Sequence, residues 1–213
     1  NQLLMNLHKL SKDISNDIVL KKFFDKIELV TPLELSSVLK EKLLQTPGID
    51  QVLEAIQIND MDSLDKIKVE VNKYMSNEIV DKTFVIRAKR VGTQDFKSMD
   101  IEQTVGGYML AHNKTKGVDL RNAEVTIKLE LEHTKLNIIT QRYSGLGGFP
   151  LGSQGEILSL MSGGFDSTVA SYLSIKRGLK THFIFFNLGG IAHEIGVKQV
   201  SWYLWNKFAS SHR

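Results

Sequence analysis

Apolar residues change their spacing along this chain, and each change indicates where one helix or strand gives way to the next. Leucines recur three residues apart over 4–10, which indicates one face of an amphipathic helix. Apolar and polar residues alternate over 19–30 around a central turn, a pattern typical of a β-hairpin. A capping sequence begins a second helix at 31–44, and residues 49–58 follow as a strand.

The order helix, two strands, helix, strand is that of a ferredoxin-like unit without its first strand. We therefore expect residues 1–50 to form a truncated ferredoxin-like domain. In the next region, two helical patterns alternate with a strand at 83–90 and a pair of strands within 123–143. They predict a second, mixed α/β unit at 51–145, with position 38 as its earliest possible start, and one buried sheet face.

Four glycines and one proline fall within Gly145–Gly152, between two well-patterned regions. We expect a flexible linker at 146–155, although such residues equally suit a simple hinge. From residue 156 onward, strand, loop, helix, strand and helix predict the first part of a doubly wound parallel sheet over 156–213. The expected fold class is thus α/β combined with α+β.

The 213 residues include 27 Lys and Arg against 24 Asp and Glu, and this net charge of +3 is too small to indicate a nucleic-acid partner by itself. The absence of cysteine excludes a disulfide scaffold and a cysteine-rich metal site. No apolar run approaches the roughly 20 residues that span a bilayer, so we expect a cytoplasmic protein with no membrane partner. The chain starts without Met and ends among strand-helix units, which we interpret as a fragment.

The strongest candidate for chemistry is the loop within Glu156–Thr168, which follows a short apolar run and precedes a helix. Residues 162–167 read Ser-Gly-Gly-Phe-Asp-Ser. Glycine allows a sharp turn, and the N–H groups at the start of a helix can hold an anion. The loop is not a Walker loop, because no Gly-Lys-Ser or Gly-Lys-Thr follows. A simpler alternative is an ordinary turn in which Asp166 and Ser167 cap the helix.

The string Ser-Gly-Gly-Phe-Asp-Ser resembles the Ser-Gly-Gly-x-Asp-Ser signature of the PP-loop ATP pyrophosphatases. Together with Arg142–Gln154 and Phe185–Val200, it closely resembles the tRNA 4-thiouridine synthetases, also called tRNA sulfurtransferases. The likeness is specific from Lys89 onward and looser before it. It implies that the second unit is a THUMP domain and that the third is the first part of a PP-loop domain.

The resemblance implies that ATP adenylates the C4 oxygen of uridine 8 in tRNA and that sulfur from a persulfide then displaces AMP. The implied cofactors are ATP and Mg²⁺, and the implied partners are tRNA and a cysteine desulfurase or another persulfide donor. Sulfur supply for the thiamine thiazole is implied as well. The family's persulfide cysteine is absent, so these residues alone are not expected to complete thiolation. Two alternatives stay open: a non-catalytic RNA-binding module, and a different PP-loop ligase.

The resemblance also implies a nucleotide site at the loop and at the ends of two strands. Asp166 is the expected catalytic residue, which would hold Mg²⁺ or fix the loop. N–H and hydroxyl groups of the loop would bind phosphates, and apolar residues after the strands would border the adenosine. The expected ATP-binding residues are Leu160, Met161, Ser162, Gly163, Gly164, Phe165, Ser167, Thr168, Phe185 and Phe186.

Five cations are expected to bind RNA: Arg87, Lys89, Arg90, Lys97 and Arg142. Arg87 and Lys89 alternate along one strand, so both side chains would lie on the face opposite the apolar core. Such runs are usually solvated surface charge, and the resemblance is what favours RNA. No series of aromatic residues indicates base stacking, so we expect recognition of a stem by its shape and phosphates.

Two further features have simple interpretations. His182, His193 and His212 lie on different elements without a cysteine, so we expect no metal site. Trp202 and Trp205 are three residues apart on the last expected helix, over 195–208, and are expected to belong to the core.

Overall fold

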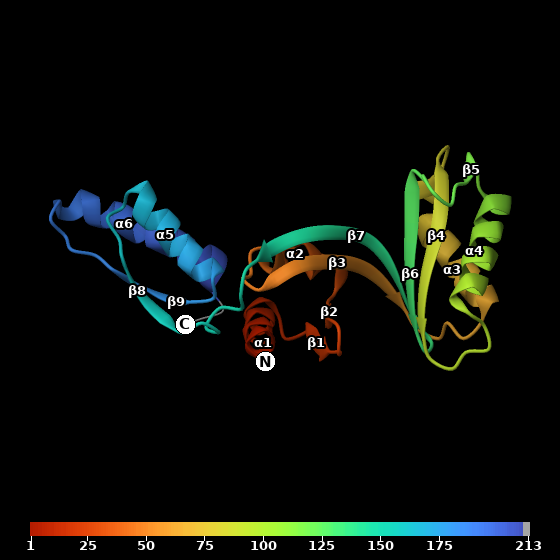
Figure 1. Ribbon diagram of the computed structural model, residues 1–213, viewed down its shortest axis with the longest axis horizontal. Helices are drawn as coiled ribbons and strands as arrows, with labels where there is room; N and C mark the ends of the chain where they lie inside the picture. Colours follow the sequence, from red (N-terminus) through yellow and green to blue (C-terminus); the bar gives the residue numbers. More distant parts are fainter. Residues whose placement is uncertain (211–213) are drawn as a thin grey trace. The chain divides into compact units, whose positions relative to one another are not determined.

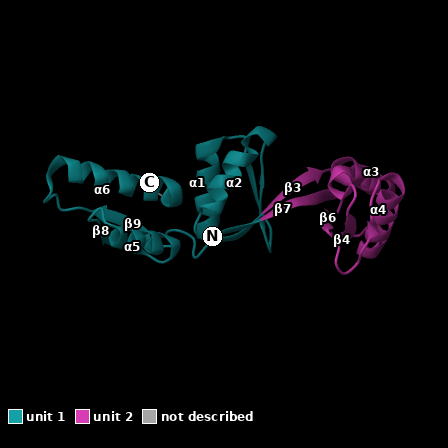
Figure 2. Ribbon diagram, turned by 90° about the horizontal axis from the view of Figure 1, so that it is seen from above, with its two compact units in different colours: residues 1–52, 143–213 teal, residues 53–142 magenta. Residues whose placement is uncertain are grey.

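The computed structural model describes residues 1–210 and divides the chain into two compact units (Figure 2). Unit 1 combines Asn1–Val52 with Tyr143–Arg213, and unit 2 consists of Leu53–Arg142. Each unit mixes helices with strands, which confirms the expected fold class. In the part of the chain that the structure describes, no helix is both long and apolar enough to cross a membrane.

The amino-terminal part of unit 1 packs two helices with a hairpin. Its elements are α1 (Gln2–Ile14), β1 (Val19–Lys22), β2 (Ile27–Val30), η1 (Leu33–Leu35), α2 (Ser36–Leu44) and the first residues of β3 (Ile49–Ile58). The antiparallel pairing of β1 with β2 confirms the expected hairpin. One face of each helix supplies the apolar core, which consists of Leu7, Leu10, Ile18, Leu39, Leu43 and Ile49.

Unit 2 is built on a mixed sheet with the strand order β3-β7-β6-β4-β5. Its further elements are α3 (Leu64–Met75), η2 (Ser76–Ile79), β4 (Thr83–Val91), α4 (Ser98–His112), β5 (Gly117–Val118), β6 (Val125–Glu132) and β7 (Lys135–Gly147). β6 pairs in parallel with β4 and antiparallel with β7. Helices α3 and α4 lie side by side next to β4 (Figure 1), and their apolar faces bury the inner side of the sheet.

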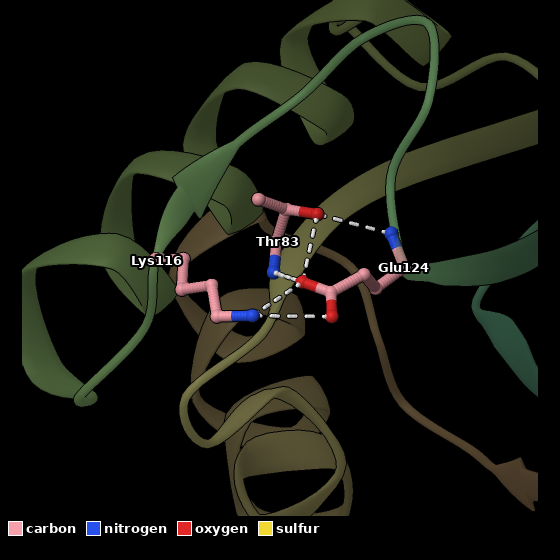
Figure 3. A network of polar contacts seen from close by, with 3 residues as sticks. All are labelled: Thr83, Lys116 and Glu124. Carbon is pink, nitrogen blue, oxygen red and sulfur yellow. Dashed lines mark hydrogen bonds and ion pairs between the residues drawn. The ribbon is translucent and has the colours of Figure 1, made fainter.

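A polar network ties the first residue of β4 to the segments before β5 and β6 (Figure 3). The Glu124 carboxylate accepts hydrogen bonds from the Thr83 backbone N–H (2.8 Å) and from Lys116 Nζ (3.2 Å). In return, the Glu124 backbone N–H donates to Thr83 Oγ1 over 3.0 Å. The Thr83 backbone hydrogen bond, followed by the bond from Lys116, lowers the pKa of Glu124. The ionised carboxylate therefore aligns the strand start.

The carboxy-terminal part of unit 1 is a strand-helix repeat. Its elements are β8 (Glu156–Leu160), α5 (Phe165–Lys176), β9 (Lys180–Ile184), α6 (Gly190–Leu204) and the π-helical turn η3 (Trp205–Ala209). β8 and β9 pair in parallel, as the doubly wound pattern predicts. The core consists of Leu151, Met161, Ile175, Val197, Leu204 and Ala209.

The last helix corrects one prediction. It begins at Gly190, five residues before the expected start, and ends at Leu204, so that Trp205 lies in η3. Only one of the two tryptophans belongs to the core. Trp205 packs against the core, whereas Trp202 is 63% exposed. The reason is helical geometry: Val197 and Leu204, seven residues apart, share the buried face, and position 202 points well away from it.

The glycine-rich segment, which the sequence predicts to be a flexible linker, makes several packing and hydrogen-bond contacts in the structure. Leu151 is 1% exposed in the core, and its carbonyl oxygen accepts a 2.9 Å hydrogen bond from Asn6 Nδ2 of α1. Three main-chain hydrogen bonds also fix the segment: Gly48 N to Gly147 O (2.8 Å), Phe149 N to Lys176 O (3.0 Å) and Gly152 N to Gly178 O (2.8 Å). The segment is thus a packed joint within unit 1. The boundaries of the three expected domains stay a prediction.

Candidate nucleotide-binding and RNA-binding sites

The loop expected to bind phosphate lies where two parallel strands end. β8 ends at Leu160, β9 ends at Ile184, and α5 begins at Phe165. The Met161 backbone N–H donates to Ile184 O over 2.8 Å, so both strand ends are held together. Ligands of parallel sheets bind at this carboxyl edge, because the loops that connect strands to helices gather there.

The hydroxyl groups of the loop hold the loop itself. Ser167 Oγ lies 3.1 Å from Ser162 Oγ and 3.1 Å from Gly164 O. Thr168 Oγ1 donates to the same Gly164 carbonyl over 2.8 Å. These hydroxyls were expected to bind phosphate, but in this structure they bind the main chain of the loop. Ser167 Oγ accepts from the Ser162 N–H and Ser162 Oγ from the Gly164 N–H, each over 3.3 Å. The N–H groups of Gly163 and of the first turn of α5 are the remaining candidates for binding an anion.

The amino end of α5 carries no side-chain cap. Its N-cap residue is Gly164, which has no side chain to cap the helix, and the Gly164 N–H donates to Ser162 Oγ over 3.3 Å. The simpler alternative, in which Asp166 or Ser167 caps the helix, is therefore not what the structure shows. The first N–H groups of α5 and the positive end of its dipole remain available to an anion.

The expected ATP-binding residues differ in what they present. Phe165 is 91% exposed, Phe186 64% and Leu160 59%, so these side chains are available to a ligand. Met161 is 2% exposed in the core and can offer only main chain at the loop. Phe185 packs against the same core. The apolar border that the sequence predicts is thus partly accessible and partly structural.

Asp166 is exposed on the first turn of α5. A carboxylate in the first turn interacts favourably with the helix dipole. Because Mg²⁺ in nucleotide sites takes one or two carboxylates together with substrate phosphates, one exposed Asp beside a phosphate loop fits that ion. Among residues 1–210, no group of three or more His, Cys, Asp or Glu side chains could hold a metal by itself.

His193 makes a contact that the sequence analysis did not assign. This residue of α6 places Nε2 2.8 Å from Ser162 O, and its ring meets the Phe185 ring edge-on at 5.1 Å. Of the other two histidines considered, His182 lies 3.3 Å from the Glu156 carboxylate, and His212 falls outside the described residues. The available signal was the position of His193 three residues after Gly190, in the first turn of a helix that follows a strand end.

The neighbouring residue Glu194 belongs to a separate polar cluster. Asn187 Nδ2 donates to its carboxylate over 3.0 Å, and Lys198 binds the other oxygen. The hydrogen bond from Lys198 is the main reason why the pKa of Glu194 is lowered. The cluster fixes the loop after β9 to the first turns of α6.

A cavity of about 860 Å³ lies between β9 and α6. None of residues 162–168 lines it, but two of the expected ATP-binding residues, Met161 and Phe185, do. Its lining residues are Met161, Thr181, His182, Phe183, Phe185, Asn187, Glu194, Val197, Lys198, Ser201, Trp202 and Trp205.

The five cations expected to bind RNA all lie in unit 2, in two different states. Arg87 Nη2 donates to Leu120 O over 2.7 Å, and Arg90 Nη1 donates to Gly92 O over 2.8 Å. These guanidinium groups hold their own unit together. Lys89, Lys97 and Arg142 are exposed.

One more exposed cation lies beside this group. Lys128 of β6 is the direct neighbour of Arg87 in β4, whereas Lys89 stands opposite Glu130. The inner face of β4 is buried, with Ile86 3% exposed, which confirms the predicted alternation. Lys128 could not be predicted from the sequence, because the two strands are about 40 positions apart in the chain and only the structure gives their register.

Two family models match the chain. Residues 61–141 match the THUMP domain, and residues 152–213 match the model described as "Thiamine biosynthesis protein (ThiI)". A tRNA sulfurtransferase of Shewanella amazonensis is 43% identical over 211 residues, which cover 98% of this chain and 43% of the relative. Another, of Vibrio vulnificus, is 54% identical over 171 residues, 80% of this chain and 35% of the relative. The chain thus spans less than half the length of these relatives.

Solved structures share the fold. The Pyrococcus horikoshii protein PH1313 is 22% identical, with a TM-score of 0.77 over 99% of this chain and 68% of its own. A 4-thiouridine synthetase, solved in complex with RNA and bound ATP, is 20% identical, with a TM-score of 0.79 over 98% of this chain and 54% of its own. From its matches to relatives and family models, this chain belongs to the tRNA sulfurtransferase family.

Proposed function

We propose that this chain binds tRNA through unit 2 and ATP at the loop between β8 and α5, as part of an enzyme that makes 4-thiouridine. In this proposal, ATP adenylates the C4 oxygen of uridine 8, pyrophosphate leaves, and sulfur from a persulfide then displaces AMP. The names of the relatives and the two family models support tRNA thiolation. The observation that carries the nucleotide step is an uncapped helix start directly after a parallel strand.

The geometry suits the leaving group of that reaction. Pyrophosphate develops negative charge, and preorganised N–H donors at a helix start stabilise such charge without side-chain rearrangement. Gly163 and Gly164 bring the main chain close to the phosphates, since no Cβ stands in front of it. Exposed Phe165, Phe186 and Leu160 would border the adenosine.

Asp166 is assigned to Mg²⁺. Its carboxylate would hold the ion, which would supply neutralisation of the charge on the leaving group. The side chain itself only has to stay ionised and accessible, and it is exposed.

The proposed binding of tRNA depends on positively charged side chains of unit 2. Lys89, Lys97, Arg142 and Lys128 are exposed cations of unit 2 that can contact phosphates. A cysteine desulfurase or another persulfide donor would supply sulfur in the cytoplasm, both to tRNA and to the thiamine thiazole.

The test is ATP–pyrophosphate exchange by the full-length enzyme with unmodified tRNA. We expect exchange that depends on both tRNA and Mg²⁺, and retention of label from α-labelled ATP on the RNA as the adenylate. Binding of tRNA without any binding of ATP would instead identify a non-catalytic RNA-binding module. Exchange that persists with a tRNA lacking uridine 8 would identify a different PP-loop ligase.

A further inference from the structure

The imidazole of His193 is the one side chain of α6 that hydrogen-bonds to the phosphate loop in the described residues. Its Nε2 lies 2.8 Å from the carbonyl oxygen of Ser162. A carbonyl oxygen can only accept, so Nε2 must carry the proton, and this contact fixes the tautomer. The interaction joins the loop after β8 to the helix that follows β9.

This hydrogen bond also orients the next donor of the loop. The carbonyl of Ser162 and the N–H of Gly163 belong to one peptide group, and the described chain contains no cis peptide bond. In a trans peptide, these two groups point in opposite directions. Holding Ser162 O toward α6 therefore turns the Gly163 N–H to the opposite side of the loop, away from His193.

The His193 side chain is exposed, but two glycines and one aromatic ring lie close to its imidazole. A Cβ on Gly189 would lie 2.6 Å from His193 Nδ1, and a Cβ on Gly163 would lie 3.7 Å from Nε2. The ring also meets the Phe185 ring edge-on. A side chain at position 189 would therefore overlap the imidazole, whereas a Cβ at position 163 would only be in ordinary contact with it.

We propose that His193 is a positioning residue for nucleotide binding, which fixes the Ser162–Gly163 peptide so that the Gly163 N–H faces a phosphate group of ATP. The inference rests on the proposed ATP binding, and it assigns to His193 no contact with the nucleotide itself. The adjacent carboxylate of Glu194 does not compete for the imidazole, because Asn187 and Lys198 occupy it.

The test compares His193→Phe with His193→Gln in the full-length enzyme. Phe keeps a flat ring without a donor, whereas the Gln amide can place an N–H close to the position of Nε2. We expect Phe to raise the dissociation constant of ATP about tenfold, as for the loss of one positioned hydrogen bond, and Gln to stay within about threefold of wild type. His182→Phe is the matched control, because it removes an exposed imidazole from β9. It should leave the dissociation constant of ATP unchanged.

A second readout does not depend on the nucleotide. The amide resonance of Gly163 in nucleotide-free protein should shift in His193→Phe and return toward its wild-type position in His193→Gln. Equal ATP affinity in Phe, Gln and wild type would overturn the inference while leaving the proposed function intact. Equal losses in Phe and Gln, with an unmoved Gly163 resonance, would overturn it as well. If the wild-type enzyme binds no ATP, the proposed function fails, and the phosphate role of His193 fails with it.

Discussion

Two glycine-rich segments of unit 1 use the same residue type for different physical ends. In the joint, Gly145–Gly152, the glycines allow main chains to touch: a Cβ on Gly145 would lie 2.3 Å from Ile49 O, and one on Gly148 would lie 2.0 Å from Lys176 O. In the phosphate loop, a Cβ on Gly164 would meet only Ser162 Oγ, at 3.5 Å. Glycine in the joint therefore serves packing, whereas glycine in the loop leaves space for a ligand to approach the main chain.

A glycine-rich stretch is therefore not by itself evidence of a flexible backbone. Glycine count alone indicates freedom of the backbone, yet the joint is fixed by hydrogen bonds on both sides. Substitutions in the joint should therefore mainly lower the free energy of unfolding, whereas substitutions in the loop should mainly weaken ATP binding.

The largest effect is expected in the joint. Gly148→Ala combines a main-chain overlap at Lys176 O with a φ of +75°, so we expect the free energy of unfolding to fall by roughly 2–5 kcal/mol. Gly147→Ala is the matched control, because its φ is +68° but nothing lies within 4 Å of the added Cβ. It should cost only about 1 kcal/mol. Urea denaturation measures both, and equal losses would show that close packing is not the reason for glycine at 148.

The second effect concerns chemistry at the loop. Asp166→Ala should leave the unfolding free energy within about 1 kcal/mol, because the side chain is exposed. ATP–pyrophosphate exchange by the full-length enzyme should fall at least about 100-fold if this carboxylate holds Mg²⁺ near the leaving group. Asp95→Ala, which removes an exposed carboxylate of unit 2, should leave exchange unchanged. Near wild-type exchange in Asp166→Ala would remove Asp166 from the catalytic proposal.

The third effect is expected at Gly163 of the loop, where a substitution should affect ATP binding more than stability. Gly163 has a φ of +80°, and an added Cβ would lie 3.1 Å from Val197 Cγ2, a contact that a small side-chain shift can relieve. Gly163→Ala should therefore cost only about 1–2 kcal/mol of stability, but raise the ATP dissociation constant about tenfold or more as the loop moves. Calorimetric titration of ATP checks this, with Gly155→Ala as a control of similar φ (+89°) and open space. A stability loss without an affinity loss would place Gly163 with the joint.

The sequence predicted those features that depend on neighbours in the chain. The strand before the phosphate loop, the helix after it and the hairpin follow from local spacing, and the structure confirms them. The features that the sequence could not predict depend on contacts with residues far away along the chain. Gly148 packs on Lys176, and His193 binds Ser162, 31 residues away. No local pattern distinguishes such a contact from a flexible turn or a solvated histidine.

Contacts with distant residues also decide which of the predicted cations are available to RNA. Arg87 and Lys89 share a strand face, as alternation predicted, but Arg87 is held by Leu120 O, 33 residues away. Whether a cation is available to RNA depends on such partners. Arg87 is exposed, as are Lys89 and Lys128, but Arg87 and Arg90 bind main-chain carbonyls of their own unit. The two lysines are therefore the better candidates.

The smallest effect is expected on this cationic face of unit 2. On this face, charged side chains would contact phosphate, whereas in the phosphate loop main-chain N–H groups would do so. Lys89→Ala and Lys128→Ala should each weaken tRNA binding severalfold and reduce the slope of log affinity against log salt by about 1, since each lost contact releases one counterion fewer. ATP affinity should not change. Lys114→Ala is the control, because this exposed lysine pairs with Asp81 at 3.0 Å. Filter binding of tRNA across a salt series makes the measurement. A lower affinity with an unchanged slope would mean that neither lysine touches phosphate, and recognition would then have to lie elsewhere on unit 2 or on unit 1.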